Sequence, residues 1–305
     1  MRSMVDEHGQ DTRAIQGTGP AGRVTRPDVE QSIERTSGDV PTGAQREPKP
    51  AGSTTSTRLH REQPPGPVAS EETVPLTRIR RMTGEHMVRS LAVAPHVMTA
   101  IEVDYEGVES ARRAHGQRFK EQFGTSLTYL PFISRALVKA IGAYPLLNAS
   151  VGDRELLLHR EINLSIAVDL DFEGLVAPVV RHAEEKGLST IGREIAELAS
   201  RARAKKLTAD DMVGGTFTVS NSGPFGTFMV APVINQPQVG ILSTDSVVRK
   251  PTVVVDEQGR ESIGIHSMGM LVLSWDHRAF DGAYAAAFMR QVKSNLETFD
   301  WDPEM

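Results

Sequence analysis

After residue 70, apolar positions recur at the two spacings that are typical of helices and strands. In residues 129–144 they lie three or four positions apart, so one helix face is apolar and carries Leu130, Ile133, Leu137 and Ile141. Similar spacing predicts helices in residues 78–90, 108–123 and 189–206, the last capped by Ser189. Short apolar or alternating runs predict strands in residues 97–103, 156–159, 162–169, 175–180, 216–219 and 268–273, and a hairpin from residues 252–256 and 262–266.

The pattern is different before residue 71. Residues 36–70 contain six prolines and only three sizeable apolar side chains, Val40, Leu59 and Val68. Too little apolar surface is available there to offset the entropy of ordering, so this segment is predicted to be a disordered, extended linker. Residues 1–35 form a separate small unit, in which a Gly-rich turn at 17–24 precedes a short helix that opens near Pro27.

Composition narrows the possible functions. The 305 residues are 39% hydrophobic, enough for a substantial core, and the net charge of −5 gives no indication of nucleic-acid binding. No apolar run of about 18 residues and no signal peptide are apparent, so we expect a soluble, cytoplasmic protein without a membrane partner. The absence of cysteine excludes disulfides and a cysteine nucleophile, and the nine histidines show no metal-ligand spacing, so no metal site is predicted.

Polar side chains with possible chemistry follow the apolar run 268–273, before a helix that begins at Gly282. They are Ser274, Asp276, His277, Arg278 and Asp281. His277 is a candidate general base, because an unperturbed imidazole titrates near pH 6.5. Asp281 could hold the loop by pairing with Arg278 or with another arginine. The alternative is that His277 is a structural residue at the end of a strand.

Two signatures resemble those of the dihydrolipoyl acyltransferases of the 2-oxo acid dehydrogenase complexes. DHRAFDG, residues 276–282, resembles their active-site motif, although its His-x3-Asp-Gly core is shared by chloramphenicol acetyltransferase-like and condensation enzymes. GGTFTVSNSGPFG, residues 214–226, resembles the second motif. The resemblance implies that His277 is the base, that Asp281 fixes the loop and that the Ser220 hydroxyl stabilises the oxyanion.

The same resemblance suggests ligand and structural roles for other residues. Arg81, on the helix in residues 78–90, is a candidate for holding the phosphates of coenzyme A, and Asn221 is a second candidate contact to coenzyme A. A solvated helix face is the alternative for the arginines. The Pro95-His96 pair is common in the family, and we expect His96 to be structural.

The first 35 residues resemble another domain of these enzymes. MRSMVDEHGQD and GTGPAGRVTRPDV, residues 1–11 and 17–29, resemble the peripheral subunit-binding domain, in which Arg2 and Arg23 would bind acidic patches on partner enzymes. We therefore expect a subunit-binding domain in residues 1–35, a linker in 36–70 and a catalytic domain in 71–305. The first helix is shorter than usual and no lipoyl domain is recognisable. We interpret this to mean that Met1 lies within a longer reading frame or that another chain carries the lipoyl group.

The family implies an architecture and an activity. Its catalytic domain is a two-layer, chloramphenicol acetyltransferase-like α/β fold that forms trimers, in which the histidine and the hydroxyl come from neighbouring subunits. It transfers an acyl group between a dihydrolipoyl arm and coenzyme A, and its partners are the decarboxylase and dihydrolipoamide dehydrogenase components. Residues 299–305 differ from the usual apolar tail, so a larger core cannot be assumed. The alternatives are a stand-alone acyltransferase of small molecules and a non-catalytic scaffold. The acyl group is predicted to be acetyl or branched, although succinyltransferases share the signatures.

Overall fold

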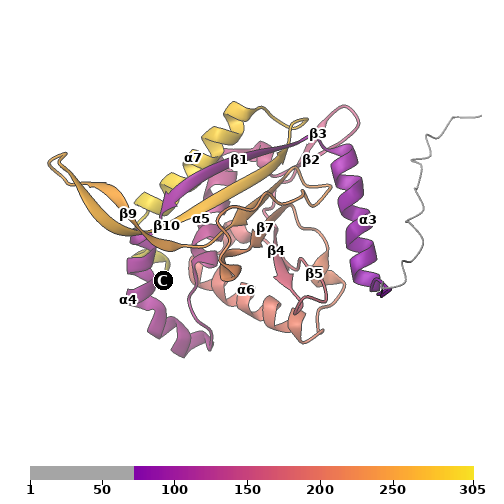
Figure 1. Ribbon diagram of the computed structural model, residues 1–305, viewed down its shortest axis with the longest axis horizontal. Coiled ribbons are helices and arrows are strands. Elements are labelled where there is room, and N and C mark those ends of the chain that lie inside the picture. The colour runs from indigo at the N-terminus through magenta and orange to yellow at the C-terminus, as the bar shows by residue number, and fades with distance from the viewer. Residues whose placement is uncertain (1–71) are drawn as a thin grey trace, which may run out of the picture. The chain divides into compact units, whose positions relative to one another are not determined.

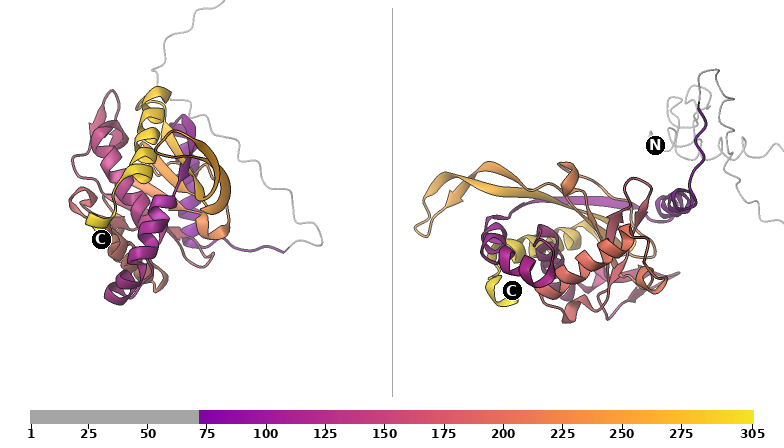
Figure 2. Two further views of the ribbon diagram at one scale, coloured as in Figure 1. Left: turned by 90° about the vertical axis from the view of Figure 1, so that its left-hand side faces the viewer. Right: turned by 90° about the horizontal axis from the view of Figure 1, so that it is seen from below.

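A mixed sheet with helices packed on one face dominates the computed structural model, which describes residues 72–305 (Figures 1 and 2). The strand order is β1-β10-β8-β7-β4-β5; β6 also pairs with β4, β9 pairs with β10, and β2 and β3 form a separate pair. The strands are β1 (His96–Asp104), β2 (Ala149–Val151), β3 (Leu156–Leu158), β4 (Leu164–Asp169), β5 (Leu175–Val176), β6 (Val179–Val180), β7 (Phe217–Asn221), β8 (Gly240–Thr244), β9 (Val248–Val255) and β10 (Glu261–Asp276). The predicted two-layer α/β architecture is confirmed.

The helices lie where the apolar spacing predicts them. They are α3 (Arg78–Val93), α4 (Glu106–Phe123), α5 (Tyr129–Ala143), α6 (Leu188–Arg203) and α7 (Gly282–Thr298). The predicted apolar face of α5 is buried. The predicted Ser189 cap is wrong: Gly187 occupies the cap position, and the backbone N–H of Leu188 donates to the distant Glu304 carboxylate at 3.1 Å.

Strand β10 is much longer than the predicted run 268–273. It has sixteen residues, because the second strand of the predicted hairpin continues into the apolar run without a break. Its first half pairs with β9 and its second half lies between β1 and β8. The predicted strand at 175–180 is instead divided into β5 and β6, which pair with opposite ends of β4.

The core supports the last residues of β10. Trp275 and Phe217 of the sheet are fully buried, as are Phe132 of α5 and Phe288 of α7. Burying an aromatic side chain contributes about 2–3 kcal/mol. The end of β10 is therefore one of the best supported places in the fold.

None of the helices described in residues 72–305 is long and apolar enough to cross a membrane. The predictions for Arg2, Arg23 and the segments 1–35 and 36–70 lie outside the described residues.

Candidate active site

His277 immediately follows β10 and is held by its surroundings. Its backbone N–H donates to the Pro95 carbonyl at 3.1 Å, and its ring centroid lies 4.8 Å from that of Trp275. The buried Trp275 indole donates to the Thr99 hydroxyl at 3.0 Å and stacks on Phe280. The imidazole side chain is 47% exposed. Its position is thus fixed while part of the ring is open to an incoming group.

Asp276 and Arg278 fix the loop on either side of His277. The Asp276 side chain is fully buried, and Arg278 donates to it through Nε at 3.0 Å and Nη2 at 2.6 Å. These hydrogen bonds raise the pKa of the Arg278 guanidinium. A bidentate pair fixes geometry as well as charge. The sequence analysis named both residues but assigned neither this role; an acid directly after an apolar strand, with arginine two positions on, was the available signal.

Asp281 does not pair with Arg278, contrary to one of the predicted options. Arg278 binds Asp276 instead, and the Asp281 side chain is 91% exposed. One Asp281 oxygen lies 3.9 Å from Nδ1 of His277, and the Asp281 carbonyl accepts from Tyr284 and Ala285 at the start of α7. Asp281 is therefore beside the imidazole and joins the loop to the helix.

Ser220 lies near the end of β7 and lines a cavity of about 560 Å³. Most of the cavity wall is apolar, with Met82 and Met87 of α3 facing Val176 and Ile241 of the sheet. No lysine or arginine lines it. The cavity can therefore accept a largely uncharged segment of a ligand beside the Ser220 hydroxyl.

A line of polar side chains crosses the same cavity. The Thr218 hydroxyl donates to Gln238 at 2.5 Å and accepts from Asn235 at 3.2 Å. Nε2 of His86 on α3 lies 3.1 Å from the Asn235 side-chain oxygen. Buried polar groups linked in this way are fixed in orientation, so they can present hydrogen-bonding groups to a ligand.

The two predicted coenzyme A contacts are placed differently. The Asn221 side-chain oxygen accepts from the Thr244 hydroxyl and the Gly223 backbone N–H, both at 3.2 Å, so it holds the loop after β7. Arg81 is exposed on α3 next to Met82, which lines the cavity, but Arg81 is outside the lining itself. His96 has the structural role expected of it, because its ring bonds the Ala94 carbonyl and the Ile234 backbone N–H.

Within one chain, Ser220 and His277 are far apart. Ser220 is level with Ser243 on β8, which is level with Val272 on β10. His277 is five positions beyond Val272 and two strands from β7, so the two residues are separated by roughly 15–20 Å. A hydrogen bond needs about 3 Å between heavy atoms. A single copy of the chain cannot bring them to one reacting group.

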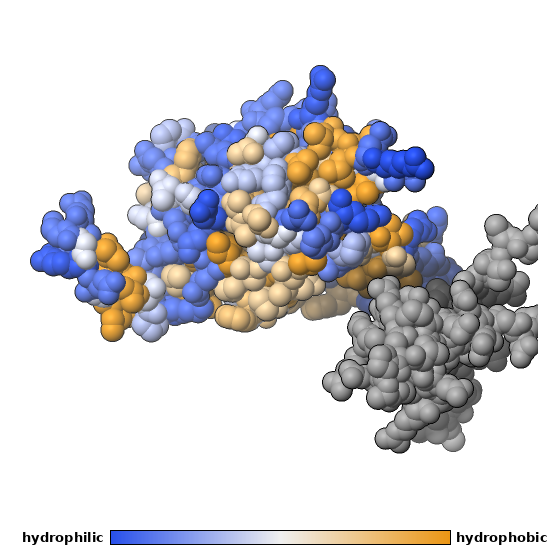
Figure 3. Space-filling model, turned by 90° about the horizontal axis from the view of Figure 1, so that it is seen from above, coloured by the Kyte–Doolittle hydropathy of each residue, from blue (hydrophilic) through white to orange (hydrophobic). Residues whose placement is uncertain are grey.

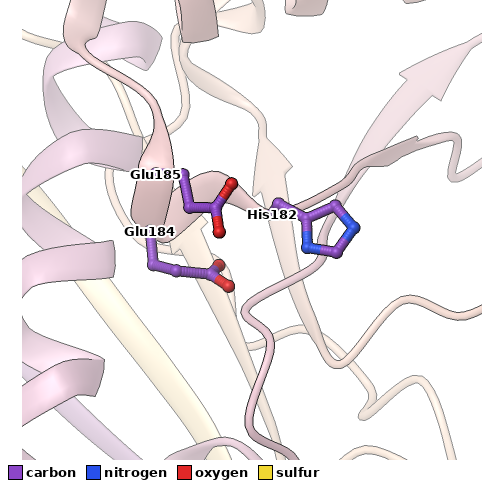
Figure 4. A group of neighbouring side chains, drawn as sticks. All are labelled: His182, Glu184 and Glu185. Carbon is purple, nitrogen blue, oxygen red and sulfur yellow. The ribbon is translucent and has the colours of Figure 1, made fainter.

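A separate group of possible metal ligands lies at His182, Glu184 and Glu185 (Figure 4). Their ligand atoms are all within 4.8 Å of one another, and the sequence analysis did not identify the group. Glu184 already accepts from the Ile162 backbone N–H at 2.8 Å. This group is remote in sequence from both signatures.

Comparison with known proteins agrees with this geometry. Residues 68–302 match the family described as 2-oxoacid dehydrogenases acyltransferase (catalytic domain), and residues 2–30 match the e3 binding domain. The chain belongs to the 2-oxoacid dehydrogenase acyltransferase family. The resemblance seen in the sequence is thereby confirmed, and with it the enzyme class.

Individual members of the acyltransferase family illustrate the likeness. The lipoamide acyltransferase component of the branched-chain alpha-keto acid dehydrogenase complex of Bacillus subtilis is 36% identical over 97% of this chain and 70% of the relative. The dihydrolipoyllysine-residue acetyltransferase component of the pyruvate dehydrogenase complex of Corynebacterium glutamicum is 35% identical, and the whole chain spans 44% of that protein.

A solved structure of a family member bears on the site. The dihydrolipoamide acetyltransferase of Azotobacter vinelandii is 32% identical, with a TM-score of 0.70 over 77% of this chain and 96% of that chain. It comes from crystallographic and enzymatic work on a serine, a histidine and an asparagine in the catalytic mechanism. That histidine and asparagine are four residues apart, as His277 and Asp281 are, and the serine precedes them, as Ser220 does here.

Proposed function

We propose that this acyltransferase moves an acyl group between the dihydrolipoyl arm of a 2-oxo acid dehydrogenase complex and coenzyme A. The observation that carries the proposal is a half-exposed imidazole on a buried, aromatic support, in a chain whose other signature places a serine beside a cavity of about 560 Å³. Transfer between thiols requires a base, an oxyanion donor and a place for the thioester, and the chain offers one candidate for each.

His277 is the base in this mechanism. It removes the proton from the thiol of coenzyme A, and the resulting thiolate attacks the carbonyl carbon of the acyl-dihydrolipoyl thioester. The Ser220 hydroxyl donates to the oxygen that becomes negatively charged. When the carbon–sulfur bond to the dihydrolipoyl arm breaks, His277 returns the proton to the departing thiolate. Asp281, 3.9 Å from Nδ1, positions the imidazole and does not accept the proton.

The site is formed between two copies of the chain. This follows from the separation of roughly 15–20 Å within one copy, which no rotamer of serine or histidine can close. We propose a homotrimer in which each copy gives His277 to one neighbour and Ser220 to the other. Arg81, beside the cavity mouth on α3, binds the phosphates of coenzyme A in this arrangement, and Asn221 shapes the loop next to the thioester.

The other predicted parts of the chain complete the proposal. Residues 1–35 act as the subunit-binding domain, where Arg2 and Arg23 recruit dihydrolipoamide dehydrogenase and the decarboxylase component; residues 36–70 are the linker and 71–305 the catalytic domain. The match of residues 2–30 to an e3 binding domain supports this assignment. Another domain or chain supplies the lipoyl group, and the complex works in the cytoplasm.

The acyl group is narrowed by the cavity. It is lined by no lysine or arginine, so a succinyl carboxylate would find no cationic partner there. This supports the predicted acetyl or branched acyl group. The two relatives described above act in a branched-chain and in a pyruvate complex, which leaves both choices open.

Turnover with defined thioesters tests the proposal. The chain is mixed with dihydrolipoamide and acetyl-, isobutyryl- or succinyl-coenzyme A, beside His277→Ala and His96→Ala. We expect transfer with an uncharged acyl group and a loss of at least about 10² in kcat for His277→Ala. Because His96→Ala disturbs structure alone, its activity per folded molecule should be much closer to the wild type. Absence of transfer from every thioester would favour a scaffold.

A further inference from the structure

The hairpin formed by β9 and β10 extends beyond the rest of the catalytic domain, and one of its faces is apolar (Figures 2 and 3). Ile263 is directly opposite Val253, and Ile265 is opposite Pro251. Because side chains alternate along a strand, these residues and Val255 share one face, which we call the apolar ribbon face. Ile263, Ile265, Val253 and Val255 are 59–82% exposed.

The opposite face of the hairpin is different. Ser262 and Gly264 alternate with the apolar residues of β10, and Thr252 lies on the same side of β9. Four half-exposed aliphatic side chains leave on the order of 400 Å² of contiguous apolar surface, which is in the range that marks a contact with another protein. Such a ribbon without a partner would also present a strand edge for aggregation.

The hairpin is rigidly attached to the sheet. At its base, Arg249 binds Glu106 at 2.6 Å, Lys250 binds Glu102 at 2.8 Å and Asp104 bonds His266. Glu106 also accepts from the Ser267 backbone N–H at 2.9 Å. The direction in which the hairpin projects is therefore set by the fold.

The hairpin and Ser220 occupy the same end of the sheet. Ser220 is level with Ser243, and β8 ends at Thr244, four residues before β9 begins. Ser246, between the two strands, donates to the carbonyls of Thr227 and Gly223 in the loop after β7. His277 lies at the other end of β10. One end of the sheet thus carries the hydroxyl and the hairpin, and the other end carries the imidazole.

We infer that the apolar ribbon face docks on the neighbouring copy of the chain, the one whose His277 completes the site at Ser220. This inference rests on the proposed function, which already requires the Ser220 end of one copy to meet the imidazole end of another. The hairpin leaves from that same end, so its partner is continuous with the interface that the site needs. Head-to-tail contacts of this kind close into a ring, which a trimer is.

The test compares two aspartate variants at adjacent positions of β10. Ile263→Asp places a charge on the apolar ribbon face, whereas Ser262→Asp places the same charge on the opposite face. Molar mass is measured by light scattering on the full 305-residue chain over a range of concentrations, together with acyl transfer. We expect self-association at least about tenfold weaker for Ile263→Asp, with transfer lost in proportion, and no comparable change for Ser262→Asp.

Each outcome decides the inference. Circular dichroism shows whether Ile263→Asp is folded, and Val253→Asp, opposite it, replaces it if it is not. A variant that keeps the wild-type mass, or a monomer that keeps full activity, overturns the inference. If the wild type shows no transfer at all, the proposed function fails, whereas a mass change confined to the ribbon variants still supports the hairpin contact.

Discussion

His277 illustrates how a reactive side chain is placed by residues that do no chemistry. Its backbone is tied to Pro95, and its ring rests on Trp275, which the core fixes. Buried Asp276 and its pair with Arg278 hold the loop that follows. The imidazole therefore has few conformations to lose when a thiol arrives, which is the condition for efficient proton transfer.

Ser220 gives a test of the oxyanion role. Replacing it with alanine removes one donor, and we expect kcat to fall by about 10²–10³ with little change in KM, because the donor acts mainly in the transition state. Ser222→Ala is the matched control, since the bonds that tie Ser222 to Thr244 and Thr227 come from its backbone N–H and carbonyl. Equal losses in the two variants would indicate a damaged loop in place of a lost donor.

The sequence could predict which residues matter at this scale, but not their separation. His277, Asp281 and Ser220 lie in local motifs, whereas the distance between Ser220 and His277 depends on the registers of β7, β8 and β10, which are set by nonlocal pairing. The Ser189 cap failed for the same reason: the carboxylate that receives the Leu188 N–H belongs to Glu304, 116 positions away.

At the scale of elements, β10 joins the two ends of the proposed interface. Its sequence pattern predicted a hairpin strand and a separate buried strand, because its exposed half alternates and its buried half is continuously apolar. The structure joins them, since no residue between His266 and Met268 breaks the ladder with β9. A continuous strand lets the hairpin and His277 keep a fixed spacing.

Glu304 fastens the segment after α7 to α5 and α6. Its side chain is largely buried and accepts from Arg135 Nε at 2.9 Å as well as from Leu188. Burial alone would raise the pKa of Glu304, but the hydrogen bonds and charge of Arg135 outweigh it and lower the pKa. Removing one member of a largely buried pair leaves the other uncompensated, so Glu304→Gln should lower the free energy of unfolding by about 2–3 kcal/mol at pH 7.

The lowered pKa fixes the sign of the pH dependence. The carboxylate of Glu304 stabilises the fold above its ordinary pKa of 4.5, and this contribution is lost as pH falls through the lower folded value. Urea unfolding between pH 7 and pH 3 should therefore show the gap between wild type and Glu304→Gln closing only in acid. Asp302→Asn, which affects an exposed pair with His115, should change stability by no more than about 0.5 kcal/mol. A gap that widens in acid would contradict this account.

At the scale of the whole molecule, the distribution of residues explains why one copy is insufficient. The sheet carries the hydroxyl at one end and the imidazole at the other, so a head-to-tail ring creates as many sites as subunits. The sequence could suggest this through resemblance alone, because no local pattern records which surfaces meet. The hairpin pattern predicted strands, but not that one face would be left open to another copy.

Mixing two inactive variants tests the shared site directly. Ser220→Ala and His277→Ala are each expected to be nearly inactive, yet after subunit exchange an intact serine should face an intact histidine at about a quarter of the interfaces of an equal mixture. The initial rate of acyl transfer should therefore recover to roughly that fraction of the wild type. A chain carrying both substitutions, mixed with either single variant, should restore nothing, because every interface then lacks the serine or lacks the histidine. If the serine and histidine of one copy formed the site, no mixture could recover activity, since neither variant contains an intact pair.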